Sequence, residues 1–252
     1  MNPNAAARLR SSTPSLGTWL SIGSPVIAEL AAECSFDWLL FDLEHGCGAE
    51  DALLGNLQAI RRSNAAAIVR VGAPRPELIL KVLDWGSDGI MIPHVSNKAE
   101  AEHAVRAAHY PPMGQRGFSR SARAYAYGLR PPATDRDSPS PLLMMQIETL
   151  EGVKNVREIA QVNGVDALFV GPSDLKFDIT RSPDIAADYS DCLRAVAGAA
   201  AETGKPWGLL IRNEDEIPSL RELGATVLAI DSDLGILRRR YVELTSRFRN
   251  DR

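Results

Sequence analysis

The stretch from Leu142 to Thr149 reads LLMMQIET, and the stretch from Ala167 to Asp174 reads ALFVGPSD. Each is a short apolar run that leads to a carboxylate, Glu148 in the first and Asp174 in the second. Apolar runs of this length are typical of strands that are buried on both faces of a parallel sheet. A carboxylate at the carboxyl end of such a strand has left the core. We therefore expect both side chains at the mouth of the fold, where paired carboxylates suit a hard divalent cation.

Two earlier apolar runs also end in polar residues. His45 ends the run 36–45, and Arg70 lies near the end of the run 65–71. Four polar residues of complementary chemistry at four strand ends predict a functional site. On the residues alone, other interpretations stay open. Glu148 and Asp174 are compatible with helix caps or ion pairs, His45 with a structural histidine, and Arg70 with a buried ion pair to Asp42 or Glu44.

The whole chain alternates between apolar runs and amphipathic segments, and this alternation predicts the fold. The expected strands are Leu16–Ile22, Trp38–Leu43, Ala67–Val71, Gly89–Val95, Leu142–Glu148, Ala167–Val170, Trp207–Ile211 and Thr226–Ile230. The expected helices are Pro25–Ala32, Glu50–Arg62, Pro76–Trp85, Asn97–Ala108, Glu151–Gln161, Ala186–Thr203, Glu214–Leu223 and Leu234–Arg247. This repeat favours a closed (β/α)8 barrel with its site at the carboxyl ends of the strands. A doubly wound open sheet is the alternative, and the lack of a glycine-rich fingerprint after the first strand weakens it.

Composition narrows the class of protein. The chain has 252 residues, a net charge of -4 and a pI near 5.6, so it lacks the basic character expected of a nucleic-acid binder. Its three scattered cysteines suit reduced thiols in a cytoplasmic protein. No apolar stretch is long enough to span a bilayer, and none resembles a signal peptide. We expect residues 1–14 to be a flexible leader and residues 15–252 to form one domain.

One connection is unusually long for a compact barrel. Residues 110–141 are rich in Pro, Gly, Arg and Ser and show no clear periodicity. Loops of this length are usually functional. We expect this segment to form a rim or lid over the mouth of the site.

Six segments together resemble a known family, the HpcH/HpaI aldolase/citrate lyase family. They are 36–46 (FDWLLFDLEHG), 69–71 (VRV), 88–93 (DGIMIP), 110–117 (YPPMGQRG), 146–151 (QIETLE) and 164–175 (GVDALFVGPSDL). The resemblance extends from Leu16 to about Ala229. It implies a (β/α)8 barrel of the phosphoenolpyruvate/pyruvate type. The implied activity is that of a metal-dependent class II pyruvate aldolase. It also implies a homo-oligomer, a hexamer or trimer, with C-terminal helices exchanged between subunits.

The resemblance assigns roles to particular residues. It implies that Glu148 and Asp174 bind a divalent cation (Mg, Mn or Co), that His45 moves protons and that Arg70 stabilises the enolate. Asp84 matches the acidic partner of the histidine. We expect the 2-oxo acid to be held by a set that shares the mouth of the barrel: Arg70, Gln146, Gly171, Pro172 and Ser173. The absence of a lysine at the matching strand ends argues against a Schiff-base aldolase.

The expected activity is cleavage or formation of 4-hydroxy-2-oxo acids, giving pyruvate or a close analogue and an aldehyde. Two alternatives stay open. One is a lyase of the citrate-lyase type that acts on a CoA thioester, and the other is a non-catalytic barrel that binds an oxo acid.

Overall fold

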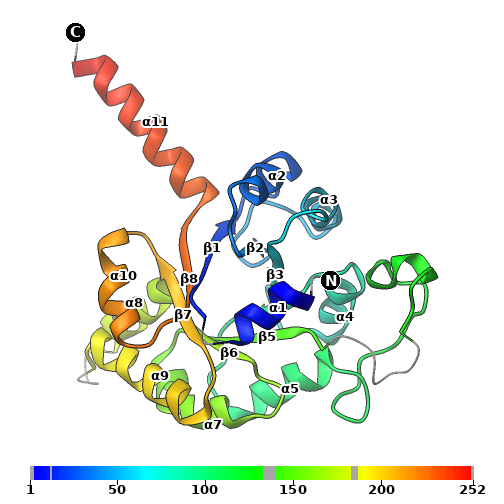
Figure 1. Ribbon diagram of the computed structural model, residues 1–252. Helices are drawn as coiled ribbons and strands as arrows, with labels where there is room; N and C mark the ends of the chain where they lie inside the picture. Colours follow the sequence, from blue (N-terminus) through cyan, green and yellow to red (C-terminus); the bar gives the residue numbers. More distant parts are fainter. Residues whose placement is uncertain (1–2, 12, 133–139, 183–186, 251–252) are drawn as a thin grey trace.

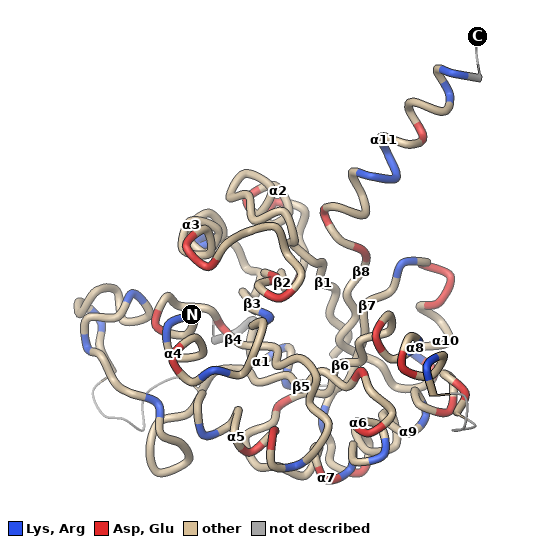
Figure 2. The backbone as a smooth tube through the Cα atoms, turned by 180° about the vertical axis from the view of Figure 1, so that it is seen from behind, with Lys and Arg blue, Asp and Glu red and all other residues tan. Residues whose placement is uncertain are grey.

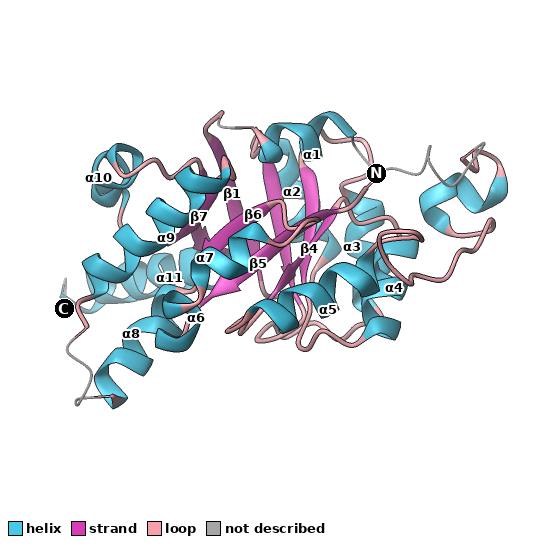
Figure 3. Ribbon diagram, turned by 90° about the horizontal axis from the view of Figure 1, so that it is seen from below, coloured by secondary structure: helices cyan, strands magenta, loops and turns pink. Residues whose placement is uncertain are grey.

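Eight parallel strands close into a barrel whose order around the sheet follows the order along the chain (Figures 1 and 3). The computed structural model describes residues 3–11, 13–132, 140–182 and 187–250. The strands are β1 (Ser15–Leu20), β2 (Trp38–Asp42), β3 (Ala66–Arg70), β4 (Gly89–Ile92), β5 (Leu142–Ile147), β6 (Ala167–Val170), β7 (Trp207–Ile211) and β8 (Val227–Ser232). All eight predicted strands are therefore present, and the (β/α)8 barrel is confirmed.

Helices surround the barrel, and most of them cover its outside (Figure 3). They are α1 (Pro3–Arg10), α2 (Pro25–Glu33), α3 (Ala52–Ala59), α4 (Pro76–Asp84), α5 (Lys98–Ala108), α6 (Leu150–Lys154), α7 (Val156–Gln161), α8 (Pro172–Arg181), α9 (Tyr189–Thr203), α10 (Ile217–Glu222) and α11 (Asp233–Asn250). The predicted helix 151–161 is divided at Asn155 into α6 and α7. The predicted helix Ala186–Thr203 corresponds to α9, and its first residue lies outside the described residues. Helices α1 and α8 were not predicted.

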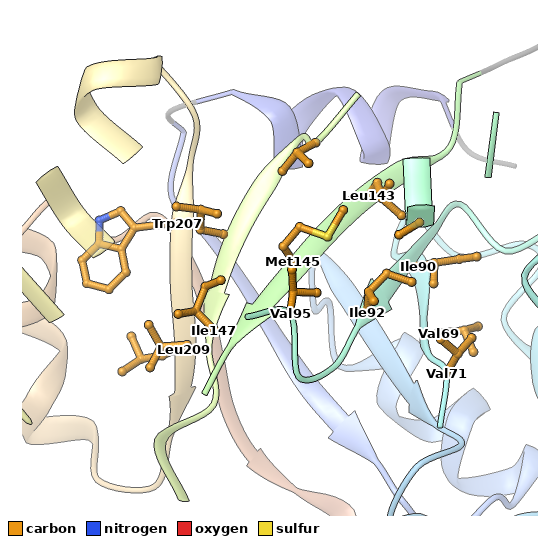
Figure 4. Packing of buried hydrophobic residues seen from close by; sticks show 14 of the residues in the cluster. Val69, Val71, Ile90, Ile92, Val95, Leu143, Met145, Ile147, Trp207 and Leu209 are labelled. Carbon is orange, nitrogen blue, oxygen red and sulfur yellow. The ribbon is translucent and has the colours of Figure 1, made fainter. Parts of the chain in front are cut away.

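Alternate residues of each strand face opposite sides of the barrel wall. One set packs against the helices in a large cluster that includes Val69, Ile90, Met145 and Leu209 (Figure 4). The other set fills the interior of the barrel together with Leu9 of α1. Its members are Trp19, Trp38, Leu40, Ala66, Ile68, Met91, Leu142, Met144, Ala167, Phe169, Val227 and Ala229. Burial on both faces explains why the strands are apolar throughout.

The N-terminal segment differs from the flexible leader that we expected. Residues 3–10 form helix α1, and Leu9 is only 1% exposed because it packs into the interior cluster. Arg10 donates to the carboxylate of Asp166, just before β6, and to the carbonyl of Ser140, just before β5. Helix α1 therefore packs at the amino end of the barrel. Residues 1, 2 and 12 of the expected leader lie outside the described residues.

The long connection 110–141 also differs from the expectation. It joins the end of α5 to the start of β5, so it begins and ends at the amino end of the barrel, opposite the mouth. Within it, Arg116 pairs with Asp84 at 2.6 Å. Arg123 donates to the carbonyls of Trp85 and Leu57, near the C-terminal ends of α4 and α3. The described part of this loop is therefore not a lid over the mouth of its own barrel. Residues 133–139 lie outside the described part.

The last helix projects away from the barrel (Figures 1 and 2). Its exposed apolar side chains are Leu234, Ile236, Tyr241, Val242, Leu244 and Phe248. A stripe of this kind is typical of a surface that another chain covers. None of the helices in the described part of the chain has the length and apolar character needed to cross a membrane.

Candidate active site

The carboxyl ends of the strands carry charged side chains at the positions that face the interior. In β2, Trp38 and Leu40 point inward, and two residues later Asp42 ends the strand. In β3, Ile68 points inward and Arg70 follows it in the same way. Because side chains alternate with period two, these polar residues lie directly above the apolar interior. Gln146 and Glu148 continue the inward set of β5 by the same spacing.

Arg70 is held from three sides at the mouth of the barrel. Its Nε and Nη2 donate to the two carboxylate oxygens of Asp42, at 2.9 and 2.7 Å, and its Nη1 lies 3.0 Å from Oε2 of Glu44. The guanidinium carbon is 5.4 Å from the ring centre of Trp19, which closes the interior beneath it. The buried ion pair to Asp42 or Glu44 that the residues alone left open for Arg70 is therefore present, and both carboxylates take part in it. The guanidinium has more N–H donors than these contacts use, so it keeps donors for a ligand.

Asp42 fixes the turn after β2 as well as the arginine. Its Oδ1 accepts hydrogen bonds from the backbone N–H groups of Glu44 and His45. Burial alone would raise the pKa of Asp42, but the hydrogen bond and charge of Arg70 lower it below its ordinary value. Asp42 is therefore a permanent anion that holds Arg70 and positions the His45 backbone.

Glu148 lies almost entirely out of solvent, at 1% exposure. Its Oε1 accepts from the backbone N–H of His94 at 2.8 Å, and its Oε2 accepts from Nε2 of Gln146 at 2.6 Å. Burial, together with the negative charges of Asp174 and Glu44, raises the pKa of Glu148 to about 7. A carboxylate that is buried among other carboxylates binds a proton or a cation more strongly than an exposed one.

Asp174 lies in the first turn of α8. It is near enough to Glu148 for its negative charge to raise the pKa of that carboxyl group. The connection into this helix passes very close to Glu148, because a Cβ on Gly171 would lie 2.2 Å from Oε2 of Glu148. Glycine is therefore required there to let the backbone approach the carboxylate. Pro172 begins the helix and Ser173 is exposed, so the free N–H groups of the first turn face the mouth.

The donor set at the mouth fits a divalent cation. Among the described residues, four carboxylates, from Asp42, Glu44, Glu148 and Asp174, lie around the guanidinium of Arg70, so negative charge exceeds the charge of this one arginine. Oε1 of Gln146 is buried without a hydrogen-bond partner in the described structure. Within the described ranges, no three or more His, Cys, Asp or Glu side chains are grouped so that they could hold a metal ion. A cation held here by two carboxylates would therefore keep positions open for a ligand and water.

His45 and Asp84 were expected to form a pair, and they do not meet within the chain. His45 is exposed in the turn after β2, at the carboxyl end of the barrel. Asp84 ends α4, which runs back to the amino end, where it pairs with Arg116. The two side chains cannot meet within one barrel, because its two ends are separated by the length of the strands. The resemblance pointed to Asp84 but did not show at which end of the barrel it lies.

His94 is a site residue whose role the sequence interpretation missed. Its ring lies between Glu44 and Glu148, 3.2 Å from an oxygen of each. Its position two residues after β4 was the available signal, since the other site residues also follow strands closely.

Comparison with known proteins shows the family of the chain. Residues 15–239 match the HpcH/HpaI aldolase/citrate lyase family. The chain belongs to this family. It is 36% identical to a 4-hydroxy-2-oxo-heptane-1,7-dioate aldolase of Escherichia coli, over 98% of this chain and 95% of that protein. It is 35% identical to a 5-keto-4-deoxy-D-glucarate aldolase of Escherichia coli O6:H1, over 96% and 95% of the two chains.

A solved member of the HpcH/HpaI family has the same fold. The crystal structure of a family protein from Burkholderia cenocepacia J2315 superposes with a TM-score of 0.89, at 31% sequence identity, and covers 99% of this chain and all of that one. Membership in the family and the similarity to these relatives along nearly the full chain identify the protein as an aldolase, a carbon–carbon lyase.

Proposed function

We propose that this member of the HpcH/HpaI family is a divalent-metal-dependent aldolase that cleaves or forms 4-hydroxy-2-oxo acids. Its products in the cleavage direction are pyruvate, or a close 2-oxo acid, and an aldehyde. The observation that carries the proposal is that Glu148, buried at the barrel mouth, interacts electrostatically with both the carboxylate of Asp174 and the guanidinium of Arg70. The names of the two relatives, both aldolases of oxo acids, support the substrate class.

Glu148 and Asp174 would hold the cation, which we expect to be Mg²⁺, Mn²⁺ or Co²⁺ because the ligands are oxygens. When bound, the cation would act as a Lewis acid on the ketone of the substrate. Gln146 keeps Glu148 in place through its 2.6 Å hydrogen bond. Gly171 leaves the space that the carboxylate needs.

Arg70 and His45 supply the remaining chemistry. Retro-aldol cleavage leaves negative charge on the former ketone oxygen, and the free donors of Arg70 can stabilise it without rearrangement, since Asp42 and Glu44 already fix the guanidinium. The exposed imidazole of His45 is available to move the proton of the 4-hydroxyl group. The first turn of α8, from Pro172 through Ser173, offers N–H groups to the substrate carboxylate.

Asp84 can assist His45 only from a second copy of the chain, because the two residues lie at opposite ends of one barrel. We therefore include a homo-oligomer, a hexamer or trimer, in the proposal, and the exposed apolar stripe of α11 supports association. A cytoplasmic location is also part of it, since Cys34, Cys47 and Cys192 are all free thiols.

Mixing inactive variants tests the shared site. Asp84→Asn and His45→Ala proteins, each impaired alone, should regain part of the activity when their subunits are exchanged. A pair of variants within one site, His45→Ala with Arg70→Lys, is the control and should regain less. If exchange is shown by mass and Asp84→Asn with His45→Ala restores nothing, Asp84 does not serve the neighbouring site.

The central experiment follows the methyl protons of pyruvate in deuterated water by NMR. The site should exchange them without any aldehyde, only when Mg²⁺, Mn²⁺ or Co²⁺ is present, and chelation should stop the exchange. Glu148→Gln should abolish it, whereas Glu151→Gln, the same change at an exposed position three residues away, should not.

The same preparation separates the alternatives. Turnover of a CoA thioester, with no cleavage of 4-hydroxy-2-oxo acids, would favour the citrate-lyase type of reaction. Binding of pyruvate with neither methyl exchange nor cleavage across a broad panel of aldols would favour a non-catalytic binding barrel.

A further inference from the structure

His94 is held in a backbone conformation that histidine seldom adopts. Its φ is 56°, in the left-handed region, two residues after β4 ends. Such conformations cost free energy in residues other than glycine, and they are maintained where surrounding contacts require them. The requirement here is a hydrogen bond, since the backbone N–H of His94 donates to Oε1 of Glu148 at 2.8 Å.

The ring of His94 continues this contact to a second carboxylate. Nδ1 lies 3.2 Å from Oε1 of Glu148, and Nε2 lies 3.2 Å from Oε1 of Glu44. The other oxygen of Glu44 lies 3.0 Å from Nη1 of Arg70. These contacts form a continuous chain, Glu148–His94–Glu44–Arg70, which crosses the mouth from the metal carboxylate to the guanidinium. The side chain of His94 is 56% exposed, while those of the three others are buried or nearly so.

This series of contacts places the ring of His94 between two carboxylates of like charge. Glu44 and Glu148 carry charges of the same sign in a region with little water, so they repel each other unless a donor lies between them. The imidazole occupies that place. Without it, Glu44 has one neighbour fewer to fix its carboxylate, and Arg70 depends on Asp42 alone for a rigid contact.

We propose that His94 is a positioning residue, which ties the metal carboxylate Glu148 to the oxyanion-binding Arg70 through Glu44. It thereby sets the position of the cation relative to the guanidinium. This inference rests on the proposed function of the site. It assigns to His94 no direct contact with substrate.

The left-handed backbone allows an unusually clean deletion. His94→Gly removes the ring and also relieves the backbone, so loss of function cannot be ascribed to strain. Partners of metal ligands typically change affinity or activity by about 10- to 100-fold when they are removed. We expect His94→Gly to weaken Mn²⁺ binding, measured by titration calorimetry, by about tenfold or more, and to lower kcat for pyruvate methyl exchange by a similar factor.

Two further variants make the test specific. Ser35→Gly is the matched control, since Ser35 is also left-handed, with φ of 63°, but is exposed and follows α2 at the amino end. It should leave Mn²⁺ affinity unchanged. Glu44→Gln keeps the shape of the side chain and removes its charge. If His94 acts through Glu44, the double variant His94→Gly with Glu44→Gln should bind Mn²⁺ only a little less tightly than whichever single variant has the lower affinity.

The outcomes separate this inference from the proposed function. Failure of the wild-type protein to bind Mn²⁺ would remove the proposed function and this inference with it. Normal wild-type binding, with an affinity and kcat in His94→Gly that stay within twofold of wild type, would overturn the inference alone. A lower melting temperature of His94→Gly with unchanged Mn²⁺ affinity would also overturn the inference, because loss of a purely structural residue has that effect. Effects of His94→Gly and Glu44→Gln that multiply would show that the two act independently and would also overturn it.

Discussion

The substitution Gly171→Ala tests how the backbone after β6 makes room for the metal carboxylate. The added Cβ would lie 2.2 Å from Oε2 of Glu148 and 2.8 Å from Nε2 of Gln146. Contacts under 3.0 Å are essentially never seen, so the carboxylate oxygen has to move by at least about 0.8 Å. Gly171 itself has φ of -90° and ψ of 93°, which alanine adopts freely. The perturbation therefore acts on the site and not on the backbone.

The expected losses follow from this geometry. Displacement of a reacting group by about 1 Å costs on the order of 100-fold in turnover. Disturbing the Gln146–Glu148 hydrogen bond should weaken metal binding by about 10- to 100-fold. Overpacking costs about 1–3 kcal/mol in folding free energy. In a chain of this size each kcal/mol lowers Tm by about 2–4 °C, so the variant should stay folded at 25 °C.

The assay compares kcat for pyruvate methyl exchange, Mn²⁺ affinity and Tm with those of Gly198→Ala. Gly198 lies inside α9, where an added Cβ meets nothing within 4 Å, and alanine there should stabilise the protein by about 0.5–1 kcal/mol. Retention of wild-type metal affinity and kcat by Gly171→Ala, within twofold, would refute the reasoning that Gly171 and Glu148 are packed for metal binding.

Three further predictions concern separate parts of the molecule. Because Glu148 has a pKa raised to about 7, protons compete with the cation below that pH, so Mn²⁺ affinity should rise by up to about tenfold per pH unit toward pH 7 and then level off. Calorimetry in buffers of different ionisation enthalpy should detect proton release on Mn²⁺ binding at pH 6 that fades by pH 8. An Mn²⁺ affinity that does not depend on pH would contradict this prediction. Arg70→Lys loses the two-point contact with Asp42 and should lower kcat/KM by about 100-fold or more. The same change at the exposed Arg75 should leave kcat/KM unchanged. Equal activity of the two variants in the exchange assay would exclude the role given to Arg70. Leu9→Ala should lower the free energy of unfolding by about 2–5 kcal/mol in urea titrations, against less than about 0.5 kcal/mol for the exposed Leu30→Ala, and an unchanged stability would mean that α1 is not part of the core.

The sequence was sufficient to predict the barrel and most of the residues at its mouth. Strands buried on both faces need apolar residues at nearly every position, so runs such as LLMMQI and ALFV are recognisable without a structure. The end of such a run is visible as the first charged residue, which is how Glu148 and Arg70 were found. Local chemistry also left open an ion pair of Arg70 to Asp42 or Glu44, because a buried guanidinium needs a carboxylate nearby, and the structure has both contacts.

The sequence alone could not decide contacts between residues that are far apart in the chain. Helix α1 looked like a loose leader because the contacts that stabilise it, such as Leu9 in the interior cluster and Arg10 with Asp166, are made with residues far away in the sequence. Helix α8 was missed because Gly171 and Pro172 resemble a loop, although proline at the first position is also a helix start. The separation of Asp84 from His45, by contrast, follows from the predicted alternation, because a residue that ends a helix between two parallel strands lies at the amino end of the barrel.

Direction and distance across the barrel are therefore what the tertiary structure decided. The alternation of strands and helices determines which residues reach the carboxyl end, because each strand runs the same way. It does not determine that the ring of His94 lies between Glu44 and Glu148, which come from the segments after β2 and β5. That contact depends on closure of the barrel and on one left-handed residue, and neither leaves a periodic signal in the sequence.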